Sequence, residues 1–250
     1  MIAIDRYLNV LILFSEEKAM WTVQELATGL NIPTSTAYRT VRELARVNML
    51  EPVIDGYYRL GAAFVEFDRR TRMTDPFVQL GMPMLPDLVQ QAGVPCVAVL
   101  ARLYGDTVMC VADARSQGAS VQTSYERGCP RPLTRGATSK AILAQMPARR
   151  LNRLLPSKDS DFRNELSLIR RSGYCITRGE VDAGRVGIAV PVSVPQQGLV
   201  ASLSIVLDAA SLNDEVERRL VLLLVSLAAI LKEQLSRGVV PASAPATHLQ

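Results

Sequence analysis

The chain has 250 residues, a formal net charge of +4 at pH 7, and one histidine, His248. His248 lies in the stretch 241–250, which is rich in Ala, Pro and Ser and therefore ill suited to packing. A chain without an imidazole in a packed region lacks the usual base of Ser-His-Asp and Cys-His systems and the commonest zinc ligand. We therefore expect no enzyme activity, no catalytic residues, and no metal or other cofactor.

Hydrophobic residues make up 48% of the chain and charged residues 21%, which is typical of a folded globular protein. The longest apolar run, 220–231, is about half the ~20 residues that a membrane span requires. The N-terminus has no signal-peptide pattern, and the four cysteines contain no C-x-x-C pair. These features predict a cytoplasmic protein with reduced thiols that does not act at a membrane.

The net positive charge does not by itself indicate nucleic-acid binding, because residues 76–250 carry it and the first part of the chain does not. Residues 1–75 carry a net charge of −1, whereas residues 76–250 carry +5. A nucleic-acid interface in the first part must therefore depend on the local placement of a few basic side chains.

The first 61 residues have the pattern of a winged helix-turn-helix. Residues 4–14 predict a helix with one apolar face, formed by Ile4, Leu8, Leu11 and Ile12. Thr22 and Glu25 have the spacing of a capping box, which predicts a second helix that ends at Gly29. A third helix is expected from about Thr34 to Val47, followed by a β-hairpin over 49–60 with an Asp-Gly turn.

The third helix carries the strongest functional signal. Its apolar positions, Ala37, Val41, Leu44 and Ala45, share one face, so the opposite face is exposed. Together with Arg59 of the hairpin, the candidate DNA contacts are Thr34, Ser35, Thr36, Tyr38, Arg39, Arg42, Arg46 and Arg59. Small hydroxyls approach phosphates and base edges closely, and arginine forks onto guanine or neutralises phosphate. The alternatives are a solvated helix face and a winged helix that binds proteins.

The rest of the chain predicts a connecting helix and a second, α+β domain. We expect a linker helix over 62–75, a domain over 76–237, and a disordered tail over 238–250. Within the domain, helices are expected over 76–92, 136–145, 161–172 and 213–236. Strands are expected over 96–103, 107–113, 174–177, 185–194 and 199–207. Antiparallel strands with helices between and after them favour an α+β sheet over a Rossmann unit.

Several segments resemble the IclR family of transcriptional regulators. The stretch from Leu26-Ala27 through Leu30-Asn31-Ile32-Pro33-Thr34-Ser35-Thr36 to Arg39 is similar to the family's helix-turn-helix. Further similarities are Gly128 with 132–144, residues 169–184, and Ile188-Ala189-Val190-Pro191-Val192. The resemblance spans about residues 4–235 in order. Two departures are Thr134 in place of the family's usual histidine and Ser139 in place of a glycine.

The resemblance implies a GAF/profilin-like second domain with a closed small-molecule pocket. Family pocket positions correspond to Ala137, Thr138, Thr177, Gly187 and Ser204, and Gly187 would leave room for a larger ligand. Backbone N–H groups near Gly136 form a candidate anion site, and Arg127, Gly128, Arg131 and Arg135 lie in the loop before it. Alternatively, these arginines are solvated loop charges. Lys140 is expected to face solvent or to cap a carboxylate, and Asp161, Glu165, Glu180 and Asp182 to be solvated.

The resemblance also implies the function. We expect a sequence-specific DNA-binding regulator, in the repressor mode, of a catabolic operon. Its partners would be a palindromic duplex, a small organic or aromatic acid, and further copies of the chain in a homodimer or homotetramer. The alternatives are a winged-helix protein-interaction module and an enzyme tethered to DNA that transforms a small molecule.

Overall fold

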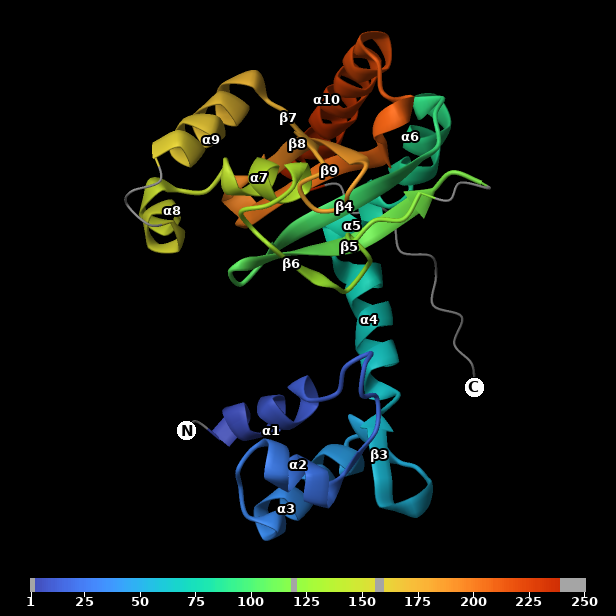
Figure 1. The fold of residues 1–250 in the computed structure, drawn as a ribbon, viewed down its shortest axis with the longest axis vertical. Coiled ribbons are helices and arrows are strands. Elements are labelled where there is room, and N and C mark those ends of the chain that lie inside the picture. The colour runs from blue at the N-terminus through green and yellow to red at the C-terminus, as the bar shows by residue number, and fades with distance from the viewer. Residues whose placement is uncertain (1–2, 118–120, 156–159, 239–250) are drawn as a thin grey trace. The chain divides into compact units, whose positions relative to one another are not determined.

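The chain divides into two units, Met1–Thr74 and Asp75–Gln250, in a computed structural model that describes residues 3–117, 121–155 and 160–238 (Figure 1). The predicted tail therefore lies outside the described residues except for Gly238, and so does His248. The predicted fold class, an N-terminal winged helix-turn-helix followed by an α+β domain, is confirmed.

The first unit consists of short helices and a small antiparallel sheet. The helices are α1 (Ala3–Ile12), α2 (Val23–Gly29), α3 (Thr34–Arg46) and α4 (Ala63–Thr74). The strands β1 (Trp21–Thr22), β2 (Leu50–Pro52) and β3 (Tyr57–Leu60) pair in the order β1-β3-β2. The two-residue strand β1 was not predicted. It is too short to show a period in the sequence.

Local chemistry explains where these elements begin and end. The side chain of Thr22 accepts a hydrogen bond from the Glu25 N–H, and the Glu25 carboxylate accepts one from the Thr22 N–H, which confirms the capping box. At the tip of the hairpin, Asp55 and Gly56 adopt positive φ angles of 58° and 77° within a short 3₁₀ turn, η1 (Ile54–Gly56). The predicted Asp-Gly turn thus forms by taking up the left-handed backbone that these residues tolerate.

Helix α1 packs through a different face from its most regular apolar stripe. Val10 and the following Phe14 are buried against the core of the unit, whereas Ile4, Leu8 and Ile12 are 60%, 47% and 74% exposed. The apolar stripe of Ile4, Leu8, Leu11 and Ile12 therefore does not form the buried face of α1. Only Leu11 of the four packs against this core.

The second unit is a six-stranded antiparallel sheet with helices on both faces. The strands are β4 (Cys96–Tyr104), β5 (Thr107–Arg115), β6 (Pro130–Pro132), β7 (Cys175–Arg178), β8 (Arg185–Val194) and β9 (Leu199–Asp208), in the order β6-β5-β4-β9-β8-β7. The helices are α5 (Pro76–Gly81), α6 (Met84–Ala92), α7 (Ala137–Leu143), α8 (Ala148–Leu154), α9 (Ser160–Ser172) and α10 (Asp214–Ser236).

Alternating side chains divide the strands between two cores. In β4, Ala98 and Leu100 face the core shared with α5, α6 and α10, whereas Val97 and Val99 face the core shared with α7, α8 and α9. Figure 1 shows these two groups of helices on opposite faces of the sheet. The sheet is therefore buried on both sides, with α7 lying directly over β8 and β9.

Three features of this unit differ from the predicted elements. The helix expected over 76–92 is two helices, because Pro83, which has no backbone N–H to donate, is the N-cap at which α6 begins. The helix expected over 136–145 is shorter, from Ala137 to Leu143. Helix α8 and the three-residue strand β6 were not predicted.

Candidate nucleic-acid interface and effector cavity

Helix α3 presents a polar, basic face to solvent. Its inner face buries Ala37, Thr40, Val41 and Leu44. The side chains of Thr34, Ser35, Tyr38, Arg39, Arg42 and Arg46 are exposed, and Thr36 is half-buried. The structure thus brings the predicted DNA-contacting residues of this helix onto one accessible surface. Ala45, expected to be buried, is only half-buried at its edge.

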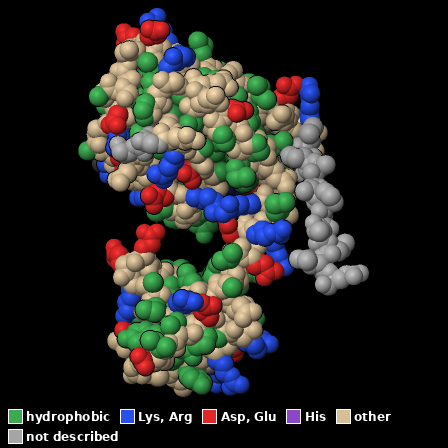
Figure 2. Space-filling model, turned by 90° about the vertical axis from the view of Figure 1, so that its right-hand side faces the viewer, with side chains coloured by type: hydrophobic (Ala, Val, Ile, Leu, Met, Phe, Trp, Pro, Cys, Tyr) green, Lys and Arg blue, Asp and Glu red, His purple; other side chains and the backbone are tan. Residues whose placement is uncertain are grey.

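The three arginines of α3 have free charges. Within the part of the chain that the structure describes, Arg39, Arg42 and Arg46 form no ion pair. Figure 2 shows Lys and Arg side chains at the surface of the first unit, interspersed with apolar and acidic ones. An arginine without a carboxylate partner can form charge-assisted hydrogen bonds to phosphate without first breaking an internal pair.

The hairpin arginine is in a different state. Arg59 on β3 lies directly opposite Glu51 on β2 and forms an ion pair with it. The Arg59 side chain is 60% exposed and the Glu51 side chain 37%, so water screens the pair and it is weak and exchangeable. The charge of Arg59 is therefore already neutralised by Glu51, whereas the arginines of α3 have no ion-pair partner among the described residues.

A small cavity lies in the second unit where α7 begins. The space free of atoms here is about 290 Å³, but this figure includes open solvent, and the cavity itself has a volume of only about 20 Å³. Segments from the start of α7, the end of β7, the β7–β8 turn and β9 meet here. The cavity is lined by Tyr125, Gly136, Ala137, Thr138, Thr177, Gly179, Glu180, Val181, Asp182, Arg185, Gly187 and Val206.

The polar groups around the start of α7 are satisfied within the chain. The Gly136 N–H donates to Oε2 of Glu180 (3.0 Å), and the Ala137 N–H donates to Oγ1 of Thr177 (2.9 Å). Thr138 Oγ1 lies 2.9 Å from Oγ of Ser204. The expected anion site at Gly136 is therefore occupied by Glu180, a carboxylate of the protein itself.

Lys140 connects this cavity to α9. Its Nζ donates to Glu165 and to Glu180, each at 2.7 Å, and its side chain is only 8% exposed. The carboxylate-capping alternative for Lys140 is thus confirmed, whereas the expectation that Glu165 and Glu180 are solvated charges is wrong. Burial raises the pKa of Glu180, but hydrogen bonds from Lys140 and the Gly136 N–H outweigh it, so the net pKa is lowered.

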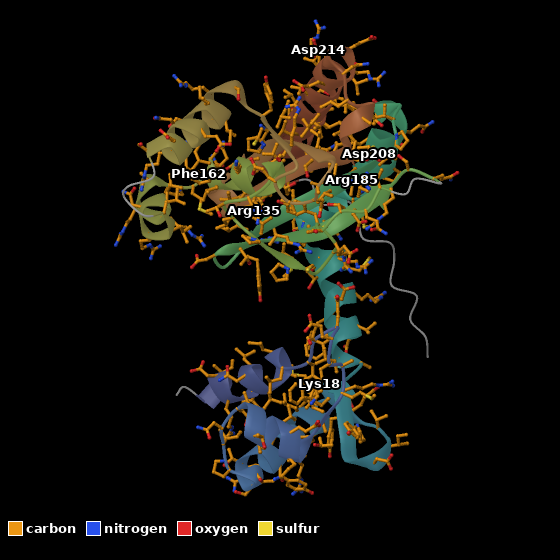
Figure 3. All side chains as sticks on the ribbon, in the orientation of Figure 1. Lys18, Arg135, Phe162, Arg185, Asp208 and Asp214 are labelled. Carbon is orange, nitrogen blue, oxygen red and sulfur yellow. The ribbon has the colours of Figure 1, made fainter. Side chains whose placement is uncertain are left out.

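Two further charged groups of the cavity wall are held in place. The Asp182 carboxylate accepts hydrogen bonds from the Ser124 N–H (2.9 Å) and from the Ser124 hydroxyl, so it is not merely solvated. Arg185 at the start of β8 pairs with Asp208 at the end of β9, and the two lie side by side in Figure 3. Arg185 is the arginine among the residues that line this cavity.

The structure brings together most, but not all, of the predicted effector residues. Ala137, Thr138, Thr177 and Gly187 line the cavity, and Ser204 is buried behind Thr138. Arg127 and Gly128 lie elsewhere, beside β5, where Arg127 donates to the Val111 carbonyl. The Cys129 N–H donates to the Glu126 carbonyl and the Gly128 N–H to the Cys110 carbonyl of β5, which holds this turn of the loop against β5.

The predicted arginine cluster does not form a common anion site. Arg127, Arg131 and Arg135 each donate to a different backbone carbonyl, those of Val111, Ser124 and Glu180. Nor does Gly187 leave room for a ligand. A Cβ there would lie 3.3 Å from the Cβ of Ala137, so the missing side chain accommodates α7 itself.

Sequence reasoning missed Tyr125 and Arg185 at this site. The Tyr125 hydroxyl lies 3.0 Å from Oγ of Ser139 and donates to the Arg135 carbonyl, and burial raises its pKa. Gly136 must be glycine here, because its φ is +83° and a Cβ would lie 2.6 Å from that hydroxyl. The close approach of Tyr125 and Gly136, eleven residues apart, leaves no periodic signal in the sequence.

The chemistry available elsewhere in the described residues is limited. No group of His, Cys, Asp and Glu side chains among them has the arrangement to hold a metal ion. All four cysteines are free thiols, and burial raises the pKa of Cys110 and Cys175 to about 12. In the same described ranges, no helix has the length and hydropathy needed to cross a membrane.

A winged helix-turn-helix joined to an α+β domain with a small cavity beside α7 defines a class of DNA-binding regulators. Two family models match the chain: the IclR helix-turn-helix domain over residues 3–53, and the C-terminal domain of the bacterial transcriptional regulator IclR over residues 78–232. The chain therefore belongs to the IclR family of transcriptional regulators, with a DNA-binding helix-turn-helix and an effector-binding domain.

Individual relatives agree with this assignment. A probable HTH-type transcriptional regulator, ArcR, of Halobacterium salinarum is 26% identical over 199 residues, which cover 74% of each chain. Two solved structures share the fold. An IclR regulator from Alicyclobacillus acidocaldarius has a TM-score of 0.78 and 22% identity, over 92% of this chain and 97% of that one. An IclR homolog from Microbacterium hydrocarbonoxydans in complex with 4-hydroxybenzoate has a TM-score of 0.77 and 23% identity, over 94% and 99%.

Proposed function

We propose that α3 enters the major groove of a specific DNA site and that Arg39, Arg42 and Arg46 make its principal contacts. The observation that carries this proposal is the unpaired state of these three arginines on the exposed face of a helix-turn-helix. The hydroxyls of Thr34, Ser35 and Thr36 at the start of the helix are placed for phosphate and base-edge contacts, with Tyr38 beside them. Arg59 contacts the flanking backbone after exchanging Glu51 for phosphate.

Replacing Arg39 and Arg42 by alanine, singly and together, is expected to weaken DNA binding by about tenfold to a hundredfold per residue that reads a base. A residue that contacts phosphate instead lowers the slope of log affinity against log salt by about one. The probe is a duplex that the wild-type protein selects from a random pool, and binding is measured by fluorescence anisotropy at several salt concentrations.

Arg171→Ala is the matched control, because Arg171 is likewise an exposed helical arginine, in the last turn of α9. This variant should bind the selected duplex as the wild type does. Unchanged affinity and salt slope in the α3 variants would exclude the major-groove assignment and leave a protein-interaction role for the winged helix.

The same proposal accounts for the expected assembly and regulation. Since residues 1–75 have a net charge of −1, a single copy has little non-specific affinity for DNA. Two copies that bind a palindromic site together gain the remaining DNA affinity by avidity. We propose that the protein is a cytoplasmic repressor of a catabolic operon and that it binds its DNA site as two copies. Its effector must bind the DNA-competent and DNA-incompetent states unequally to change their populations.

We further propose that the effector is a small organic or aromatic acid bound in the cavity, with its carboxylate on Arg185. The complex of the Microbacterium homolog with 4-hydroxybenzoate supports an acid of this size. Within the cavity wall, the oxygens of Glu180 and Asp182 already accept hydrogen bonds, whereas the guanidinium of Arg185 has donors beyond its pair with Asp208.

In a thermal-shift panel of aromatic and short-chain carboxylates on the full chain, at least one acid is expected to raise the melting temperature. 4-Hydroxybenzoate and its neutral analogue 4-hydroxybenzyl alcohol form the first matched pair. Arg185→Gln should abolish the shift, whereas Arg178→Gln, which removes an exposed arginine paired with Glu217, should retain it. Equal shifts with acid and alcohol, or in both variants, would contradict a carboxylate site at Arg185.

A further inference from the structure

Helix α10 is apolar on two opposite faces. One face buries Leu220, Leu224, Ala228, Leu231 and Leu235 against the sheet. On the other side, Leu222 is 71% exposed, Ile230 46% and Val225 42%. A surface helix normally turns polar side chains to water, so a second apolar face indicates a surface that a partner covers.

The charged residues of this outer face lie only toward its two ends. Glu215, Arg218 and Arg219 stand near the N-terminal end of α10 and Glu233 and Arg237 near the C-terminal end, all five exposed. Asp214, labelled in Figure 3, marks the N-terminal end. Between them the outer face carries Leu222, Val225, Ser226, Ala229 and Ile230. The pattern is an apolar centre with charged flanks.

This pattern is symmetric about Ser226. Leu222 and Ile230 lie four residues before and after it, Arg219 and Glu233 lie seven, and Glu215 and Arg237 lie eleven. Steps of four, seven and eleven residues return to the same face of an α-helix after about one, two and three turns. If a second α10 ran antiparallel across a two-fold axis at Ser226, apolar side chains would face each other and each acid would face an arginine.

We propose that the outer face of α10 is a self-association surface, which pairs antiparallel with α10 of a second copy of this chain. A two-fold contact requires a self-complementary surface, and the matched charges supply it. An unrelated partner would need no such match. The proposal goes beyond DNA binding, because it joins effector domains whether or not DNA is present.

Existing contacts of these charges are compatible with the pairing. Arg237 forms an ion pair with Glu233 one turn earlier, and both side chains are more than half exposed. Arg219 donates through one amino group to the Ala92 carbonyl (2.7 Å), which fixes its guanidinium and leaves its remaining donors free. Within the described residues, no ion pair of Glu215 is found, so that carboxylate is open to a partner.

A charge-swap experiment tests the pairing on the full chain without DNA. Sedimentation velocity over a concentration series should show that Glu215→Arg and Arg237→Glu each weaken association about tenfold, because each places two like-charged pairs across the two-fold axis. The double variant Glu215→Arg/Arg237→Glu should restore it. Such rescue cannot arise within one helix, where residues 215 and 237 stand about 33 Å apart.

Cross-linking gives an independent readout that does not depend on weakening the protein. The Ser226→Cys variant places two thiols at the two-fold axis and should form a disulfide-linked dimer under mild oxidation. Ser167→Cys, at an exposed position of α9, and the wild type, whose cysteines are buried or half-buried, should not. Failure of rescue together with absence of the Ser226→Cys dimer would overturn the proposal. DNA binding by α3 would be untouched by that result.

Discussion

Replacing Gly61 with alanine is expected to destabilise the first unit by about 3 kcal/mol or more, out of the ~5 kcal/mol typical of a small domain. A Cβ at Gly61 would lie 2.2 Å from the backbone oxygen of Asn48 and 2.9 Å from its carbonyl carbon. That oxygen also accepts the Ala63 N–H at 3.0 Å, so it is not free to withdraw. To relieve the clash, the end of β3 would have to move away from Asn48 and from the adjacent strand β2.

Trp21 provides the measurement. It is the only tryptophan of the chain, and its indole N–H donates to the Leu13 and Lys18 carbonyls within the first unit. Its fluorescence in a urea titration therefore reports this unit alone. Gly56→Ala is the matched control, because Gly56 has a φ of +77° but open space around it, so alanine should cost only about 1 kcal/mol. Equal midpoints for the two variants would show that the backbone at Gly61 yields.

Replacing Lys140 with methionine is expected to destabilise the second unit by about 2–3 kcal/mol at pH 7. The change leaves Glu165 and Glu180 without their shared cation in a partly buried place. The side chains of these glutamates are 39% and 33% exposed, so water screens part of the loss, and the effect falls below that of a fully buried pair. Far-UV circular dichroism melts of the full chain measure it.

The pH dependence of this effect has a definite sign. The folded pKa of Glu180 is lowered from its ordinary 4.5, so its contribution is complete above that value and is lost as the pH falls through the folded pKa. The difference between wild type and Lys140→Met should therefore be largest near neutrality and shrink below about pH 4.5. Lys232→Met, on α10, is the control and should change little at either pH. A constant difference down to pH 3 would contradict the role of Glu180.

The helix-turn-helix could be predicted almost completely, because its signals are local. A capping box, a glycine stop and an Asp-Gly turn each act within a few residues, and each appears in the structure at its expected place. The orientation of α1 could not be predicted from its apolar stripe. Several apolar faces were available, and the fold uses the one that contains Val10.

The candidate effector cavity was only partly predictable, because it is built from segments far apart in the chain. Thr177, Gly187 and Ala137 meet there as the family resemblance implies, since β7, β8 and α7 converge. The partners of Arg127 and Arg131 could not be foreseen. A loop arginine finds whichever carbonyl the folded loop presents, and spacing along the chain carries no information about that choice.

The occupied state of the cavity wall has a consequence for how strongly an effector can be held. A carboxylate that binds the remaining donors of Arg185 shares this guanidinium with Asp208, and one that reaches the start of α7 must displace Glu180. The ligand then gains only the difference between its own hydrogen bonds and those it replaces. If the proposed effector binds here, we therefore expect modest affinity, so that the protein would ignore traces of the metabolite and respond when it accumulates.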